Sequence, residues 1–298
     1  MRVRFHGIPR PVLFDGCADL LDRLAPLTQG WRWQASDDPA APIISVTAVT
    51  SGWRIVSQWT PEPATYDDAA DIVCALFADL VLAYVEADPR LLCLHAGAVA
   101  IGPNTNGGSN AAAPLFVFPA ETQAGKSTLT AALAISGGCL YSDDVLPIDL
   151  GSPAASAVAI GLAPRPRLPL PDALPPHLHE AMLRRIALSN SRYGYVALAR
   201  EQLAPLGERR PIAAFVRLER AAGHAALTDA PRSEIMTLLL RQNFGARPPA
   251  GEMVERFAAL TAAARCWRLR YNDVGEAVAL LMAQAAQTAA SAAHRLSA

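Results

Sequence analysis

The chain has 298 residues, of which 52% are hydrophobic and 18% are charged, and its formal net charge is −1 at pH 7. This composition excludes disorder over most of the length, and the near-neutral charge excludes a general electrostatic attraction to nucleic acid or anionic membranes. The length predicts one substantial core with a smaller attached module.

Short apolar runs separated by Gly, Pro and Asp residues predict small strands in the first 60 residues, for example at 43–49 and 53–57. They predict a small N-terminal α+β accessory region over 1–65, whose position suggests a role in recruiting substrate. A larger domain is predicted over 66–290, and the Ala-rich residues 291–298 predict a flexible tail.

The next predicted element is an amphipathic helix over 69–85, because apolar residues recur there at three- and four-residue spacing. Asp71 and Asp79 interrupt its apolar stretch, so we expect a core helix and not a membrane span. A β-rich run follows at 91–101, and the Gly-, Asn- and Pro-rich residues 102–114 predict an exposed loop.

The middle of the chain predicts a strand, a loop, a helix, a second strand and an acidic pair, in that order. Residues 115–118 form a continuously apolar run of the kind found in fully buried strands, and a helix is predicted over 126–136. The second strand, at 139–142, delivers Asp143 and Asp144 at its carboxyl end. Nucleotide-binding α/β proteins show this order.

The rest of the chain predicts further strands and helices around a Pro-rich segment at 164–176, which we expect to be extended. Strands are predicted at 157–163, 211–218 and 267–271, and helices near 232–243, near 249–264 and from 273 to about 289. Together these elements predict an α/β fold.

The cysteines and the first residues both favour a cytoplasmic protein. Residues 1–16 lack the continuous apolar stretch and the small-residue cleavage site of a secretion signal. The five cysteines are scattered, odd in number and without the paired spacing of metal ligands, which favours a reducing compartment. They are Cys17, Cys74, Cys93, Cys139 and Cys266.

Residues 120–128 match the phosphate-loop pattern G-x-x-x-x-G-K-[ST] at every position except the first. They are Ala120, Glu121, Thr122, Gln123, Ala124, Gly125, Lys126, Ser127 and Thr128. In such a loop, backbone N–H groups surround phosphate oxygens at a helix N-terminus, where the helix dipole favours negative charge. Gly125 permits the close approach, Lys126 can contact the β and γ phosphates, and the Ser127 hydroxyl can bind Mg²⁺. The alternative is an ordinary glycine-capped turn before an Ala-rich helix.

Ala120 stands where the pattern has its first glycine. At a negative φ the alanine costs little, whereas at a positive φ it would strain the loop and weaken nucleotide binding. The sequence therefore leaves two functions open, an active ATP-dependent kinase and a catalytically weak ATP-binding accessory protein.

Asp143 and Asp144 stand where nucleotide-binding α/β proteins carry a metal-binding carboxylate. Adjacent residues on an extended chain point in different directions, so one carboxylate can hold Mg²⁺ while the other accepts a hydroxyl proton. An exposed Asp-Asp turn without a catalytic role is the alternative.

Three segments, LHAGAVA at 94–100, PAETQAGKSTL at 119–129 and YSDDVLPI at 141–148, resemble HPr serine kinase/phosphorylase-like proteins. The chain looks closest to the HPr-kinase-related branch often found beside peptide-modification and cofactor-biosynthesis genes. The resemblance extends more weakly over 90–285, and it implies a P-loop-containing core akin to phosphoenolpyruvate carboxykinase. It also implies ATP and Mg²⁺ binding and transfer of the γ-phosphate to a serine hydroxyl of a protein or peptide. Phosphate transfer to a small molecule stays open as a third function.

The resemblance also implies roles for single side chains. Lys126 and Ser127 match the phosphate-loop lysine and the metal-binding hydroxyl, Asp143 matches the catalytic base, and Asp144 matches the metal ligand. His95 matches the histidine that precedes the loop, where it would orient or tune an acidic base. The acidic-Arg-Gly-Leu-Gly segment of the bifunctional enzymes is not found, so we do not expect the reverse dephosphorylation.

Arg165, Arg167 and Arg241 could neutralise phosphate charge, although arginines in Pro-rich or helical surface segments are more often simply solvated. His177 and His179 follow two prolines and should begin a helix, where residues two apart do not face each other, so we expect no metal there. The expected partner is a protein or peptide bearing a serine, with no nucleic acid and no membrane. A homo-oligomer stays open.

Overall fold

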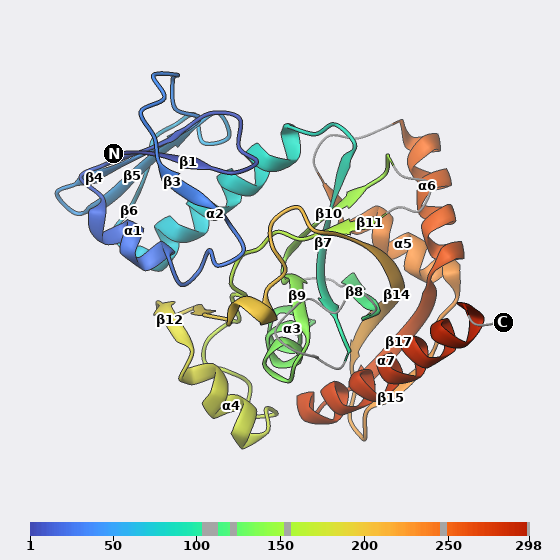
Figure 1. Ribbon diagram of the computed structural model, residues 1–298. Helices are drawn as coiled ribbons and strands as arrows, with labels where there is room; N and C mark the ends of the chain where they lie inside the picture. The colour runs from blue at the N-terminus through green and yellow to red at the C-terminus, as the bar shows by residue number, and fades with distance from the viewer. Residues whose placement is uncertain (103–112, 120–123, 152–155, 245–248, 297–298) are drawn as a thin grey trace.

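The computed structural model describes residues 1–102, 113–119, 124–151, 156–244 and 249–296 (Figure 1). Most of the loop predicted at 102–114 lies outside these ranges. Within them the chain has a mixed α/β fold with two main sheets, which confirms the predicted α/β class. No helix in the described ranges has the length and apolar character needed to cross a membrane.

The N-terminal strands form the first sheet, in the order β3-β1-β2-β4-β5-β6. They are β1 (Arg2–Phe5), β2 (Val12–Asp15), β3 (Trp33–Ala35), β4 (Ile44–Val49), β5 (Gly52–Ser57) and β6 (Ala64–Tyr66), and α1 (Ala18–Leu24) follows β2. The strands predicted at 43–49 and 53–57 are confirmed as β4 and β5, whereas α1 has no counterpart among the predicted elements.

The helix predicted at 69–85 is α2 (Ala69–Glu86), which runs from the first sheet toward the second (Figure 1). The Asp68 carboxylate caps its first turn, accepting hydrogen bonds from the N–H groups of Ala70 (2.8 Å) and Asp71 (3.1 Å). One face of α2 shares the core of the first sheet, through Ile72, Val73, Leu76 and Leu80. Its C-terminal turns also pack against the second sheet, through Val81 and Val85. The predicted division of the chain at residue 65 stays a prediction.

Asp79 is a buried carboxyl on α2, with 4% of its surface exposed. Burial raises its pKa from the ordinary 3.8, against hydrogen bonds with Ser57 and Thr60 that lower it. The native state therefore binds this proton more tightly than the unfolded chain. Ionisation of Asp79 thus costs stability above its native pKa, and the cost disappears as the pH falls toward 3.8.

We expect Asp79→Asn to raise the melting temperature at pH 7 by about 2 °C, because the variant buries no charge. In thermal unfolding scans the gain should shrink as the pH is lowered toward 4. Asp22→Asn, at an exposed position of α1, serves as the control. A gain of the same size at both pH values would contradict the assignment to the Asp79 charge.

The second sheet has the order β11-β10-β7-β8-β14-β17-β15, and β9 and β16 also pair with β7. Its strands are β7 (Leu91–Ala100), β8 (Leu115–Pro119), β9 (Cys139–Ser142), β10 (Val145–Asp149), β11 (Ser156–Val158), β14 (Arg209–Arg220), β15 (Ala226–Asp229), β16 (Asn243–Phe244) and β17 (Arg265–Tyr271). β8, β14 and β17 are parallel, and β9 runs in the same direction because β8 and β9 both pair antiparallel with β7. The carboxyl ends of these four strands therefore lie toward one edge of the sheet.

Helices cover both faces of the second sheet (Figure 1). On one face, α3 (Lys126–Ile135), α4 (Pro176–Leu183) and α7 (Val274–Leu296) share a core with Phe116 and Phe118 of β8. On the other face, α5 (Arg232–Gln242) and α6 (Ala250–Ala263) share a core with Leu115 and Val117. Because β8 side chains alternate between two cores, the strand has to be apolar throughout, as its sequence predicts.

Several of the predicted elements differ from the structure in length, among them the strand predicted at 211–218, which is the longer β14. The strand predicted at 157–163 is wrong beyond Val158, because the chain then leaves the sheet ladder: the Ala159 N–H bonds to the Glu208 carbonyl and the Ile160 N–H to the Tyr141 carbonyl, both at 2.9 Å. The helix predicted to end near residue 289 continues to Leu296. Further elements have no predicted counterpart, among them β10, β15 and the hairpin of β12 (Ile186–Ser189) and β13 (Gly194–Val196).

Candidate active site

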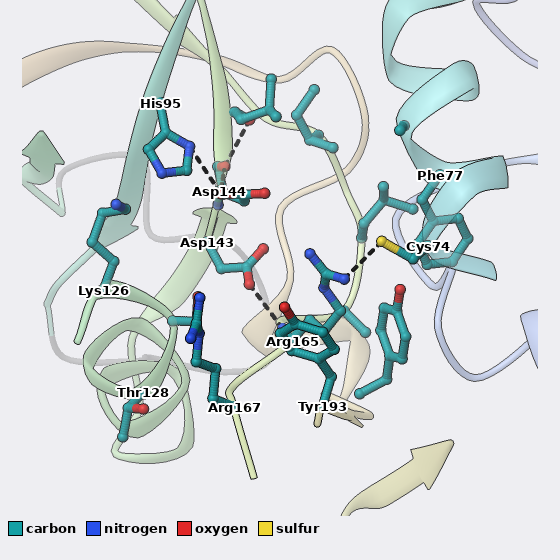
Figure 2. Close-up of a pocket in the computed structure, with 18 of the residues that line it drawn as sticks. Cys74, Phe77, His95, Lys126, Thr128, Asp143, Asp144, Arg165, Arg167 and Tyr193 are labelled. Atoms are coloured by element: carbon teal, nitrogen blue, oxygen red, sulfur yellow. Dashed lines mark hydrogen bonds and ion pairs between the residues drawn. The ribbon is translucent and has the colours of Figure 1, made fainter. Parts of the chain in front are cut away.

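A cavity of about 750 Å³ lies where the carboxyl ends of the second sheet meet α2. One wall comes from the first turn of α3, the turn after β9 and the segment that precedes α4 (Figure 2). The opposite wall is one face of α2, and it consists of Cys74, Phe77, Ala78, Val81 and Leu82. The cavity thus joins a polar half to a largely apolar half.

The start of α3 supplies the predicted phosphate-loop residues Gly125, Lys126, Ser127 and Thr128, which all line the cavity. Gly125 has a φ of +89°, a left-handed conformation that glycine adopts without strain. Lys126 is the first residue of the helix and only 6% exposed, and it is also the only lysine in the sequence. The remaining loop residues of the prediction, Ala120, Glu121, Thr122 and Gln123, lie outside the described ranges.

Asp143 and Asp144 occupy the turn between β9 and β10 and reach the same cavity as Lys126 (Figure 2). Ser142 fixes this turn, because its Oγ donates to the Val145 carbonyl (2.7 Å) and accepts from the Asp144 N–H (3.2 Å). Burial lowers the pKa of Lys126, while the charges of Asp144 and Asp143 oppose that shift. The acidic pair therefore does form a turn, but one that presents both carboxyl groups to the lysine.

His95, on β7, contacts the second of these acids. Its Nδ1 lies 3.0 Å from Oδ1 of Asp144, and the strand register sets the contact because His95 pairs with Val145 of β10. Burial would raise the pKa of Asp144, but the hydrogen bond from His95 and the charges of His95, Arg165 and Lys126 outweigh it and lower the pKa. The histidine thus keeps Asp144, the predicted metal ligand, ionised, and its contact is with that residue and not with the predicted base.

Asp143 has a different environment from its neighbour. Its Oδ2 accepts a hydrogen bond from the backbone N–H of Arg165 (2.8 Å), and its carboxyl group also bonds with Ser127. Burial raises the pKa of Asp143, and the charge of Asp144 raises it further. Two adjacent carboxyl groups with opposite shifts suit two tasks, since one can hold a cation while the other accepts a proton.

Two of the three arginines proposed from the sequence, Arg165 and Arg167, line the cavity. The Arg165 guanidinium lies 4.4 Å from the ring centroid of Tyr193 and donates from Nη1 to Sγ of Cys74 (2.7 Å), so it joins the acidic turn to α2 (Figure 2). Arg241 is exposed on α5 and does not line the cavity.

The site offers oxygen ligands for magnesium. The Ser127 hydroxyl and the Asp143 and Asp144 carboxyl groups are the hard donors that Mg²⁺ prefers, and kinase sites supply one or two carboxylates while phosphates and water complete the coordination. In the described residues, no group of three or more His, Cys, Asp or Glu side chains has the arrangement of a metal site. His177 and His179, for which no metal was expected, lie on α4.

Arg220 and the α2 wall have no counterpart among the predicted site residues. Arg220 ends β14, next to β8, and lines the cavity beside Gly125. Arg220 could have been found from the sequence, because it follows the strand predicted at 211–218 and ligands bind beyond the carboxyl ends of parallel strands. The α2 wall carried no such signal, because its residues are about 40 positions or more from the loop and have the pattern of ordinary helix core.

Comparison of the chain with protein-family models finds no match, and comparison with curated proteins finds none either.

Gly125→Ala is expected to impair phosphate binding as well as stability. A Cβ at this position would lie 2.5 Å from Nη2 of Arg220 and 3.0 Å from the Tyr271 hydroxyl, at a φ of +89°. Gly137, beyond the other end of α3, gives a matched control, since its φ is +105° and a Cβ there meets nothing within 4 Å. Both variants should lose about 1 kcal/mol of unfolding free energy from backbone strain. Gly125→Ala should lose more unfolding free energy than Gly137→Ala, and it alone should weaken the ATP binding predicted from the sequence, as measured in calorimetric titrations. Equal effects of the two variants would contradict this.

Proposed function

We propose that this protein is an ATP- and Mg²⁺-dependent kinase that transfers the γ-phosphate of ATP to a serine hydroxyl of a protein or peptide, on an HPr-kinase-like, P-loop-containing core. One observation carries the proposal. Lys126 and Ser127 at the start of α3 and the carboxyl groups of Asp143 and Asp144 line one cavity, at an edge where several strands end. A buried ammonium, a helix N-terminus and oxygen ligands for Mg²⁺ are the parts that phosphoryl transfer needs.

In the proposed reaction, the first turn of α3 and the Lys126 ammonium hold the triphosphate and neutralise its charge. Asp144 and Ser127 would hold Mg²⁺, which would screen the phosphate oxygens. Asp143 accepts the proton of the serine hydroxyl as that oxygen bonds to the γ-phosphorus. The bond from the γ-phosphorus to the β–γ bridging oxygen breaks, and ADP leaves. The raised pKa of Asp143 supports the role of base, because it makes the carboxylate a better proton acceptor than an ordinary aspartate.

The acceptor is expected to approach along α2. The cavity continues from Asp143 past Arg165 to Phe77 and Val81 of this helix, away from the start of α3. An apolar wall beside the base favours an acceptor whose hydroxyl is flanked by apolar groups, and an extended peptide can present such groups beside its serine. The N-terminal sheet, which shares its core with α2, would contact the rest of that acceptor.

The proposal is tested by incubating the protein with ATP, Mg²⁺ and a library of serine-containing peptides, with intact mass as the readout. Peptides that gain one phosphate, and whose alanine-for-serine versions do not, are the expected result. Omission of Mg²⁺ should abolish the gain. A parallel incubation contains a mixture of metabolites in place of the peptides. Phosphate transfer to a metabolite and to none of the peptides would show that the acceptor is a small molecule.

A second candidate function rests on Ala120, which replaces the first glycine of the loop pattern. In this alternative the protein binds ATP but turns it over poorly, and it serves as an accessory protein of a peptide-modification or cofactor-biosynthesis system. Tight ATP binding without any phosphorylated product would favour the accessory protein. Restoring the pattern with Ala120→Gly should then raise phosphate transfer, whereas an active kinase would change little.

A further inference from the structure

The carboxyl ends of β14 and β17 bring an arginine and a tyrosine together beside the start of α3. Arg220 is the last residue of β14 and Tyr271 the last residue of β17, and the two are paired in the strand register. β14 is the neighbour of β8 on the side away from β7, and β9 pairs with β7. The acidic turn and Arg220 therefore lie on opposite sides of the strand that leads to α3.

Three contacts hold the Arg220 side chain in place. Its guanidinium carbon lies 4.3 Å from the ring centroid of Tyr271, and Nη1 donates to the Asn272 carbonyl (2.9 Å). Nη2 lies against Gly125, because a Cβ added to this glycine would be only 2.5 Å from Nη2. The Tyr271 hydroxyl in turn donates to the Ala124 carbonyl at 3.3 Å. Arg220 and Tyr271 thus buttress the chain just before Lys126.

Arg220 faces the cavity, whereas Tyr271 is buried behind it. Tyr271 has no exposed surface and does not line the cavity, whereas Arg220 is exposed and does. The guanidinium carbon lies over the Tyr271 ring, and Tyr271 does not line the cavity, so the cavity meets Arg220 from a side other than the ring. A flat cation supported from behind by an aromatic ring is a surface on which a second π system stacks well.

The positions of the phosphates decide what can reach this surface. On the proposed function, the triphosphate lies at the start of α3 with its γ end toward Asp143 and Asp144. The other end of the nucleotide must then leave on the side away from the acids, toward β14 and β17. We propose that the purine base of the bound nucleotide stacks on the guanidinium of Arg220. This inference rests on the proposed nucleotide binding, and it assigns the nucleoside end of the site.

The test compares ATP with inorganic tripolyphosphate, which has the phosphates but no base, in calorimetric titrations with Mg²⁺ present. Arg220→Ala and Arg220→Lys are expected to weaken ATP binding about tenfold more than they weaken tripolyphosphate binding. Lys keeps the charge but lacks the flat face, so it separates stacking from charge attraction. Arg270→Ala is the control, because Arg270 forms an ion pair with Glu219 at 3.3 Å and does not line the cavity. It should bind both ligands like the unaltered protein.

Other outcomes would overturn the inference. Equal weakening of ATP and tripolyphosphate by Arg220→Ala would exclude a contact with the base: recovery in Arg220→Lys would make Arg220 a phosphate contact, and no recovery would make it only a support of the loop. Unchanged ATP affinity in Arg220→Ala would show that Arg220 does not contact the bound nucleotide. If the unaltered protein binds neither ligand, the proposed function itself fails and the inference fails with it. Tripolyphosphate binding also reports whether the start of α3 stays folded in each variant.

Discussion

Replacing Lys126 with Ala is expected to abolish ATP-dependent phosphate transfer, with a fall of at least about a thousandfold in turnover. Lys126 is 6% exposed and lines the same cavity as Asp143 and Asp144. Without it, two carboxyl groups would face the polyphosphate with one cation fewer, and the repulsion would weaken both binding and transfer. Initial rates with a responsive peptide, and ATP affinity by calorimetry, measure the two effects.

The single lysine allows an independent test with the unaltered chain. An amine-directed reagent can modify only the Lys126 side chain and the N-terminal amine, because the sequence has no other lysine. ATP should protect Lys126, while the N-terminal amine reacts as before, and peptide mass mapping separates the two. Lys126→Met keeps the aliphatic volume and guards against a packing artefact. Full activity in Lys126→Met, or labelling of Lys126 that ATP does not affect, would refute the assignment.

Asp143→Asn is expected to remove turnover while sparing ATP binding. Asn has the same shape and can still accept the hydrogen bond from the Arg165 N–H, so the turn should hold. It cannot accept a proton, and the loss of a general base lowers rates by about 100- to 10,000-fold. Single-turnover rates should therefore fall while the ATP dissociation constant changes by less than about threefold.

The neighbouring residue gives the matched comparison. Asp144→Asn removes the proposed Mg²⁺ ligand and the ion pair with His95, so it should weaken ATP binding in the presence of Mg²⁺ and have little effect without Mg²⁺. If Asp143→Asn instead lost Mg²⁺-dependent binding and Asp144→Asn lost only turnover, the two roles would have to be exchanged. Retained transfer in both variants would exclude the acidic pair from the chemistry.

The sequence predicted well the local elements around the candidate site. The buried strand at 115–118, the helix from Lys126 and the strand that ends before Asp143 can be predicted because each depends on neighbouring residues: continuous apolar character, a glycine before a helix, and acids after a strand. The contact of His95 with Asp144 could not be predicted. It depends on the register between β7 and β10, and β10 itself has no clear pattern in the sequence.

The sequence by itself placed the groups of the proposed chemistry, namely one lysine, a hydroxyl and two carboxyl groups, at the ends of local elements. Only the tertiary structure decided their surroundings: Arg220 beside Gly125, the opposite pKa shifts of Asp143 and Asp144, and α2 as the far wall of the cavity. The physical reason is the range of the interactions. Helix starts and buried strands follow from residues within a few positions, whereas burial, strand register and charge contacts come from segments that are distant in sequence and meet only after the sheet has formed.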